Sequence, residues 1–143
     1  MKQRNMINIV TGVIGSDAHI IGNRILQIAL EDAGYNVVGL GILVSQEEFI
    51  QAAIETNAGA ILVSSLYGMG QIDCQGFRDK CIESGLDNIT LYVGGNLGLG
   101  KKDWKDIEKV MLEQGFNRAF PPDTMPEDVI KLLDEDLLNN IKQ

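Results

Sequence analysis

Short apolar runs typical of β-strands alternate with helix-like segments from one end of the chain to the other. The runs are apolar throughout rather than at every second residue, which indicates strands buried on both faces of a parallel sheet. We expect these strands at about residues 7–13, 37–44, 60–65, 90–93 and 117–120. The expected helices span about 22–33, 45–56, 71–84 and 103–114, and a last helix has Pro126 in its first turn.

Strands and helices in this order predict an α/β fold, namely a doubly wound, flavodoxin-like (Rossmann-like) three-layer sandwich. The predicted sheet is parallel and five-stranded, with strand order 2-1-3-4-5. Two capping boxes support the helix boundaries, one formed by Ser45 and Glu48 and the other by Thr124 and Glu127. No linker, repeat or low-complexity segment interrupts the pattern, so residues 1–143 are predicted to form a single domain.

The composition is that of an ordinary globular protein. Of the 143 residues, 45% are hydrophobic and 22% are charged, which excludes a disordered or collagen-like chain. The net charge of −8 argues against nucleic acid and against an anionic membrane surface as partners, because both attract basic proteins. No apolar stretch approaches the ~20 residues of a membrane helix, and the run at 6–14 fits a first strand better than a secretory signal. Cys74 and Cys81 lack a zinc or redox spacing, which indicates reduced thiols in a cytoplasmic protein.

Glycines gather where the first, third and fourth strands end. Of 16 glycines, nine lie in these three regions, namely Gly12, Gly15, Gly22, Gly68, Gly70, Gly94, Gly95, Gly98 and Gly100. Ligands of doubly wound folds bind beyond the carboxyl ends of the strands, and these three regions share that edge. Glycine lets the backbone approach a ligand closely. The sequence therefore predicts a wide, backbone-lined surface for a large ligand.

The only histidine, His19, lies after the first strand, two residues beyond Asp17. The Asp17 carboxylate can accept the hydrogen of one ring nitrogen and leave the other nitrogen as a basic lone pair. Such a pair suits a metal ligand or a general base. A metal site made of protein ligands alone is poorly supported, because no second histidine or cysteine lies nearby, and the nucleophile elbow of a hydrolytic triad is missing. The remaining possibility is one axial ligand to a metal whose other positions a macrocycle fills.

Three separated elements extend this pattern, with 41 and 27 residues between them: Asp17-Ala18-His19-Ile20-Ile21-Gly22, Ser64-Ser65-Leu66 and Gly94-Gly95. Together they resemble the cobalamin-binding motif Asp-x-His-x-x-Gly, Ser-x-Leu and Gly-Gly. The resemblance implies that His19 replaces the dimethylbenzimidazole of the cofactor as the axial ligand of cobalt. Asp17 would orient His19, so the resemblance assigns the catalytic role to these two residues.

The resemblance also implies a pocket for the displaced nucleotide tail. Ser64 would hydrogen-bond the benzimidazole, Leu66 would line its pocket, and Gly94 with Gly95 would leave room for the tail. Each of these residues also has an ordinary structural explanation, as a strand cap, a core residue or a turn. The other residues expected to contact the cofactor are Ser16, Ala18, Ile20, Gly22, Ser65, Asn96, Leu97, Gly98, Leu99 and Gly100.

Further stretches of the chain, at 12–17, 52–56, 64–68, 72–74 and 93–96, resemble the small, cobalamin-binding subunits of glutamate mutase (methylaspartate mutase). The resemblance implies an adenosylcobalamin-dependent isomerase that is active only with a large barrel subunit, in a heterotetramer. The implied reaction is the radical interconversion of L-glutamate and threo-3-methylaspartate. Substrate-binding residues would then lie on the large subunit.

Alternatives within the cobalamin class are a subunit of another carbon-skeleton mutase and a corrinoid methyl carrier. A signalling receiver would need an Asp at the end of the third strand and a Lys at the end of the fifth, where this chain has Ser64-Ser65 and Phe120-Pro121. A flavodoxin would need a Ser/Thr-rich phosphate loop in place of Gly15-Ser16-Asp17-Ala18.

Overall fold

The structure, a computed structural model, describes residues 3–15, 21–65, 70–95, 97 and 103–138. In this part of the chain, five strands form one sheet with the order β2-β1-β3-β4-β5, and every neighbouring pair is parallel. The strands are β1 (Asn8–Val13), β2 (Asn36–Gly39), β3 (Ala60–Ser65), β4 (Thr90–Gly95) and β5 (Arg118–Phe120). The predicted fold class and strand order are confirmed.

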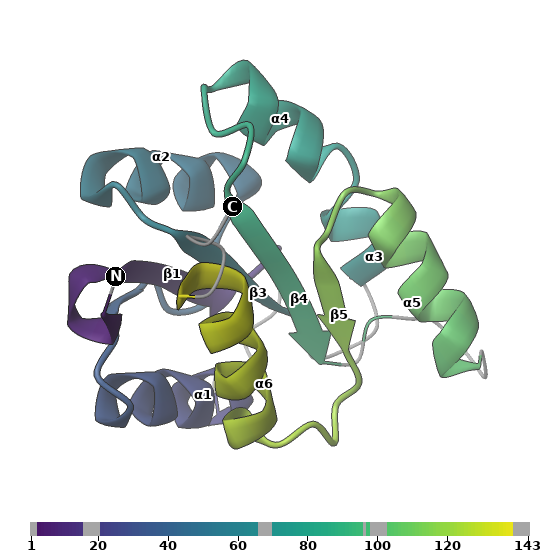
Figure 1. The fold of residues 1–143 in the computed structure, drawn as a ribbon. Coiled ribbons are helices and arrows are strands. Elements are labelled where there is room, and N and C mark those ends of the chain that lie inside the picture. The colour runs from purple at the N-terminus through teal and green to yellow at the C-terminus, as the bar shows by residue number, and fades with distance from the viewer. Residues whose placement is uncertain (1–2, 16–20, 66–69, 96, 98–102, 139–143) are drawn as a thin grey trace.

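Helices cover both faces of the sheet (Figure 1). They are α1 (Ile21–Asp32), α2 (Gln46–Thr56), α3 (Gly70–Asp73), α4 (Phe77–Glu83), α5 (Trp104–Glu113) and α6 (Pro126–Leu133), with a 3-10 turn η1 (Arg4–Met6) and a π turn η2 (Asp134–Leu138). Helices α1 and α6 pack on one face and α2, α4 and α5 on the other. No helix in the described ranges is both long enough and apolar enough to cross a membrane.

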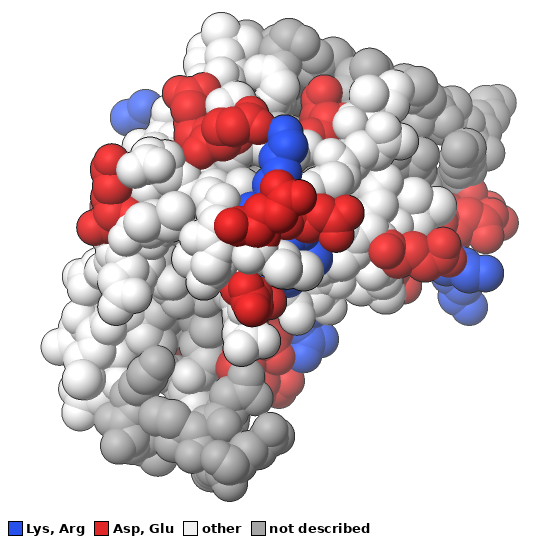
Figure 2. Space-filling model, turned by 90° about the horizontal axis from the view of Figure 1, so that it is seen from above, with Lys and Arg blue, Asp and Glu red and all other residues white. Residues whose placement is uncertain are grey.

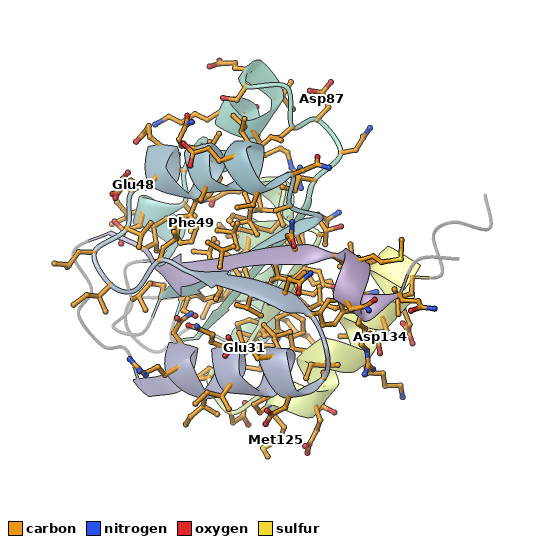
Figure 3. All side chains as sticks on the ribbon, turned by 90° about the vertical axis from the view of Figure 1, so that its left-hand side faces the viewer. Glu31, Glu48, Phe49, Asp87, Met125 and Asp134 are labelled. Atoms are coloured by element: carbon orange, nitrogen blue, oxygen red, sulfur yellow. The ribbon has the colours of Figure 1, made fainter. Side chains whose placement is uncertain are left out.

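The central strand β3 divides its side chains between the two cores. Ile61 and Val63 pack with the residues of α2, α4 and α5, whereas Ala60 and Leu62 pack with α1 and α6. This division follows from the alternation of side chains along a strand. It explains why the strand sequences are apolar throughout. Figure 3 shows Phe49 reaching from α2 toward the sheet, where its ring lies 5.8 Å from that of Phe77.

Two predicted element boundaries are wrong. The second strand ends at Gly39 rather than Val44, because Gly41 and Leu43 adopt positive φ angles of 83° and 58°, which a strand cannot contain. Val44 keeps only an isolated bridge to Ile14. The helix predicted at 71–84 is broken into α3 and α4 by Gly76, whose φ of 76° lies in the left-handed region.

The two predicted capping boxes have different outcomes. At α2 the box is confirmed, because the Ser45 hydroxyl accepts from the Glu48 N–H at 3.1 Å and Glu48 Oε1 accepts from the Ser45 N–H at 3.0 Å. At α6 the box is wrong. The helix begins at Pro126, so the N-cap residue is Met125, whose side chain has no oxygen that can accept a capping hydrogen bond. Pro126 does occupy the first turn as predicted.

Charged side chains on the face above α2 and α4 are mixed, and acidic ones are more numerous (Figure 2). On this face Lys80 Nζ lies 2.6 Å from Glu47 Oε2. Both side chains are well exposed, so the pair adds little to stability. The described residues on this face form no basic stripe of the kind that binds nucleic acid.

The amino edge of the sheet is tied to the C-terminal turn η2 by two polar clusters. In the first, Asp134 accepts from Arg4 Nε at 3.0 Å and from the Tyr35 hydroxyl at 2.6 Å. In the second, Asp136 accepts from Arg118 Nε at 2.8 Å and from the Tyr92 hydroxyl. Figure 3 shows Asp134 beside the turn at the start of the chain. The clusters fasten the last described segment to the strands.

Lowering the pH should weaken the attachment of η2 to the sheet through Asp134. The hydrogen bond from Arg4 holds the pKa of Asp134 below its usual value, although burial opposes it and Tyr35 assists it. A carboxylate with a lowered folded-state pKa contributes stability that is full above its unfolded pKa of about 3.9 and is lost as pH falls through the lowered value. We expect Asp134→Asn to lower the free energy of unfolding by about 1 kcal/mol at pH 7, and by less at pH 3.

Urea unfolding followed by circular dichroism at the two pH values measures this difference. Asp87→Asn, at an exposed position, is the matched control and should change stability little. Equal destabilisation by Asp134→Asn at both pH values contradicts the role given to the carboxylate.

A candidate ligand cavity at the carboxyl edge of the sheet

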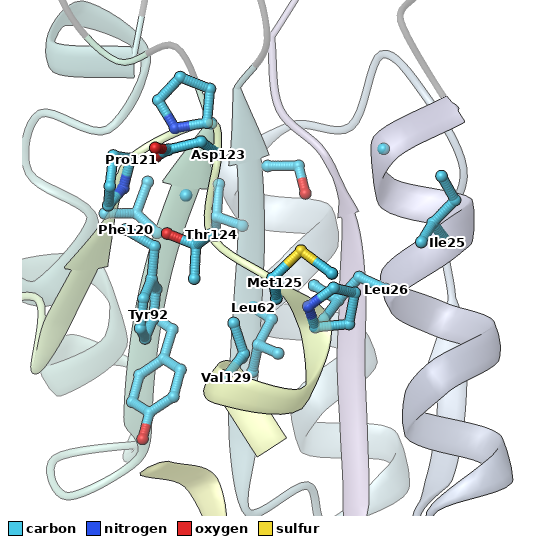
Figure 4. A pocket seen from close by; sticks show the side chains of 18 residues that line it. Ile25, Leu26, Leu62, Tyr92, Phe120, Pro121, Asp123, Thr124, Met125 and Val129 are labelled. Carbon is cyan, nitrogen blue, oxygen red and sulfur yellow. The ribbon is translucent and has the colours of Figure 1, made fainter. Parts of the chain in front are cut away.

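A cavity of about 490 Å³ opens at the carboxyl ends of β3, β4 and β5, between α1 and α6 (Figure 4). Each neighbouring element contributes an apolar wall, namely Leu26 of α1, Leu62 of β3, Tyr92 of β4, Phe120 of β5 and Val129 of α6. Such a cavity suits a largely apolar group, because removing the apolar walls from water is favourable.

The Tyr92 side chain is held at both ends. Its ring packs edge to face against Phe120, with 5.4 Å between the ring centroids, and both rings line the cavity. Its hydroxyl donates a hydrogen bond to Asp136 of η2. Burial raises the pKa of the Tyr92 hydroxyl, and the hydrogen bond to Asp136 raises it further, so the hydroxyl stays protonated as a donor. This wall of the cavity is therefore fixed by a contact at the opposite edge of the sheet.

Four of the predicted site residues meet at this cavity although they are far apart in the sequence. Gly22, Ser64, Gly94 and Gly95 all line it. The sheet brings them together, because β3 and β4 pair in a register that places Ser64 beside Gly94 and Ser65 beside Gly95. Two motif elements that are separated along the chain thus lie side by side at the ends of adjacent parallel strands.

The two neighbouring glycines serve different needs. A Cβ atom on Gly94 would lie 3.5 Å from Phe120 Cβ, an ordinary contact, so the missing side chain leaves space for a ligand rather than relieving a clash. Gly95 has a φ of 107°, which other residues rarely adopt. Gly94 keeps the cavity open, and Gly95 lets the chain turn at the end of β4.

Two other predicted contacts lie elsewhere. Ser65 is fully buried and, following the alternation of β3, faces away from Ser64. Its hydroxyl has no hydrogen-bond partner among the described residues. Leu97 is buried in the core beneath α5 with Val63 and Val93. Neither residue lines the cavity, and their contact with a cofactor remains a prediction.

The remaining predicted residues lie outside the described part of the chain: Ser16, Asp17, Ala18, His19, Ile20, Leu66, Asn96, Gly98, Leu99 and Gly100. The residues that flank 16–20 are fixed, however. The Ile14 N–H donates to the Ser64 carbonyl at 3.0 Å, and the Gly15 N–H donates to the Val44 carbonyl at 2.8 Å. Gly15 therefore lies at the carboxyl edge of the sheet, and α1, which begins at Ile21, contributes Gly22 to the cavity wall.

Gly15, at the end of the first strand region, has a conformation that requires glycine. Its φ of 74° lies in the left-handed region, and a Cβ atom there would clash with the Asp73 carboxylate. Any side chain at Gly15 would have to displace Asp73.

The two cysteines, Cys74 beside Asp73 in the chain and Cys81 in α4, are free and buried. Burial raises the pKa of both thiols, so neither is a reactive thiolate at neutral pH.

Asn23 was not predicted as a site residue from the sequence, yet it hydrogen-bonds Ser64, which lines the cavity. Its side-chain Nδ2 donates to Ser64 Oγ at 3.0 Å and to Thr11 Oγ1 at 2.9 Å. The signal that could have identified it is its position on α1. Asn23 lies three and seven residues before Leu26 and Leu30, where an inward-facing residue is expected to be apolar.

Known proteins resemble this chain in sequence and in fold. The B12 binding domain family matches residues 7–116. The glutamate mutase sigma subunit of Carboxydothermus hydrogenoformans is 59% identical over 131 residues, covering 92% of this chain and 96% of that protein. The glutamate mutase sigma subunit of Clostridium tetani is 58% identical over 134 residues, covering 94% of this chain and 96% of that protein.

Among solved structures, a novel cobalamin-binding protein from Desulfitobacterium hafniense DCB-2 superposes with a TM-score of 0.73 at 23% identity, which shows the shared fold. The match covers 92% of this chain and 59% of that one, so the chain spans about three fifths of its length. By its sequence, this chain belongs to the B12 binding domain family and, within it, to the glutamate mutase sigma subunits.

Proposed function

We propose that this chain is the cobalamin-binding subunit of an adenosylcobalamin-dependent glutamate mutase, and that His19 is the axial ligand of the cobalt. The observation that carries the proposal is the meeting of Gly22, Ser64, Gly94 and Gly95 at one cavity, and in the sequence Gly22 follows His19 by three residues. Membership of the glutamate mutase sigma subunit family supports it.

The cavity fits the nucleotide tail of cobalamin. The benzimidazole of that tail is a flat, mostly apolar ring system with one nitrogen atom whose free lone pair can accept a hydrogen bond. Leu62, Tyr92 and Phe120 supply apolar walls for its faces and edges, and Ser64 supplies a hydroxyl. Burying the ring here removes apolar surface from water on both sides, which favours binding.

The motif residues then have distinct tasks. The Asp17 carboxylate accepts the hydrogen of one His19 ring nitrogen, which fixes the tautomer and directs the other nitrogen at the metal. Ser64 hydrogen-bonds the tail, and the apolar walls exclude water from it. When bound, adenosylcobalamin supplies the radical chemistry of the carbon-skeleton rearrangement. The tasks of this chain are to hold the cofactor and to orient the ligand.

A large barrel subunit completes the proposed enzyme as a heterotetramer and binds L-glutamate and threo-3-methylaspartate. The term sigma subunit in the names of the relatives supports an assembly of unlike subunits. The buried, free cysteines support the cytoplasm as its location. Mixed with the large subunit and adenosylcobalamin, the chain should support interconversion of the two amino acids, measured by chromatography. Methyl transfer in place of this rearrangement contradicts the proposal.

Loss of the axial ligand gives the sharpest test. We expect His19→Gly to weaken cobalamin binding by roughly 100-fold or more, and Asp17→Asn by about 10- to 100-fold, because a residue that orients a ligand matters less than the ligand itself. Isothermal titration calorimetry of the full chain with its large subunit measures both values. In the Co(II) state, ¹⁵N-labelling of histidine should change the electron paramagnetic resonance splitting from triplets to doublets. Unchanged splitting would show that His19 does not bind the cobalt.

Gly94→Ala tests the tail pocket separately. The added methyl group meets only ordinary contacts at Phe120, so the protein should keep its melting temperature within a few degrees. The same methyl group reduces the space for the tail, and overpacking of this kind costs about 1–3 kcal/mol. We therefore expect roughly ten-fold weaker binding of cobalamin and unchanged binding of cobinamide, which has no nucleotide tail. Equal weakening of both ligands would place the tail elsewhere.

A further inference from the structure

One buried polar side chain near the cavity has no part in the motif. Asn23 lies in the first turn of α1 and is only 1% exposed. It shares a helix face with Leu30, which belongs to the core beneath α1 and α6. Burying an amide costs free energy unless it forms hydrogen bonds, and an apolar residue would pack at this position without that cost. We therefore expect the role of the Asn23 amide to lie in the hydrogen bonds that it makes.

Those groups lie on two adjacent strands. The Asn23 Nδ2 donates at 2.9 Å to Oγ1 of Thr11, which is fully buried on β1, and at 3.0 Å to Oγ of Ser64 on β3. The side-chain NH₂ group has two hydrogens, and both are used. Thr11 thereby fixes the orientation of the amide, and the amide fixes one hydrogen-bonding site of Ser64.

The hydrogen bond from Asn23 determines whether the Ser64 hydroxyl donates or accepts a hydrogen bond on its cavity side. A serine hydroxyl has one hydrogen to donate and two lone pairs that accept. Because Asn23 donates to it, the hydrogen of Ser64 Oγ points elsewhere, and Ser64 makes no other side-chain hydrogen bond within the described residues. Ser64 is 8% exposed and lines the cavity, so the cavity is where a partner for this hydrogen can bind.

We propose that Asn23 is a positioning residue that fixes the Ser64 hydroxyl as a hydrogen-bond donor into the cavity. The cavity thereby selects a cobamide whose tail carries an aromatic ring nitrogen with a free lone pair, and it discriminates against a tail with a phenyl ring. This inference rests on the proposed function, because it concerns the tail pocket of the same site. It adds a residue outside the motif and a preference among tail bases.

The test compares affinities for three ligands: cobalamin, a phenolyl cobamide whose tail ring lacks nitrogen, and cobinamide, which lacks the tail. Isothermal titration calorimetry of the full chain, in the presence of the large subunit, measures each affinity. The wild-type chain should bind cobalamin roughly ten-fold more tightly than the phenolyl cobamide, as expected for one hydrogen bond to a buried group.

Asn23→Asp reverses the hydrogen bond with little change of shape. A carboxylate only accepts, so Ser64 must donate to it and can no longer donate into the cavity. The variant should bind cobalamin and the phenolyl cobamide with about equal affinity, whereas its affinity for cobinamide should not change. Asn23→Leu is the second variant, in case a buried carboxylate prevents folding. It frees the Ser64 hydroxyl to rotate and should reduce the preference by several-fold.

Ser64→Ala is the matched control, because it removes the hydroxyl and leaves Asn23 in place. If Asn23 acts through Ser64, Asn23→Asp should change the preference no further in the Ser64→Ala background. A melting temperature for each variant shows that it folds. Independently of any ligand, Ser64→Ala should shift the side-chain NH₂ resonances of Asn23 in a ¹⁵N spectrum.

Two negative results are distinguishable. If the Asn23 variants are folded and keep the wild-type preference between the two tailed ligands, the positioning role of Asn23 is wrong and the proposed function stands. If wild-type chain binds cobalamin no more tightly than cobinamide, the tail pocket itself is wrong, and the inference fails with it.

Discussion

Every residue of β3 is buried, since strands flank it on both edges and helices cover both of its faces. Under this constraint the interior of the sheet accepts apolar side chains almost exclusively, and polar chemistry moves to the ends of the strands. Ser64 lies at such an end, where β3 meets the cavity. The same constraint explains why the strand residues of the cavity wall are mostly apolar, with the Ser64 hydroxyl as the polar group that β3 contributes.

Much of the fold could be predicted because the constraint is visible in the sequence. Continuous apolar runs indicated buried parallel strands, and the predicted strand order is the one found. The errors arose where local backbone geometry decides the outcome. Gly76 breaks a helix through a left-handed conformation that periodicity alone does not show. At the early end of β2, Gly41 was a local signal that the apolar run outweighed, whereas the positive φ of Leu43 is one that its residue type disfavours.

The site was predictable in part for a related reason. Ser64 and Gly94 could be placed together because they lie at the carboxyl ends of two strands that were predicted to be neighbours, and β3 and β4 are paired. Asn23 could not be found in this way, since its importance comes from contacts with Thr11 and Ser64 that only the packing of α1 on the sheet creates. Asp17 and His19 lie outside the described residues, so their roles still rest on the motif and on the fixed residues that flank them.

Tyr92 connects two parts of the molecule that otherwise have separate tasks. Its ring forms part of the cavity, while its hydroxyl is anchored on Asp136 near the end of the chain. Because its hydroxyl is anchored, the Tyr92 side chain resists rotation even when no ligand contacts its ring. The shape that an incoming cofactor meets thus depends on how firmly η2 is packed against the opposite edge of the sheet.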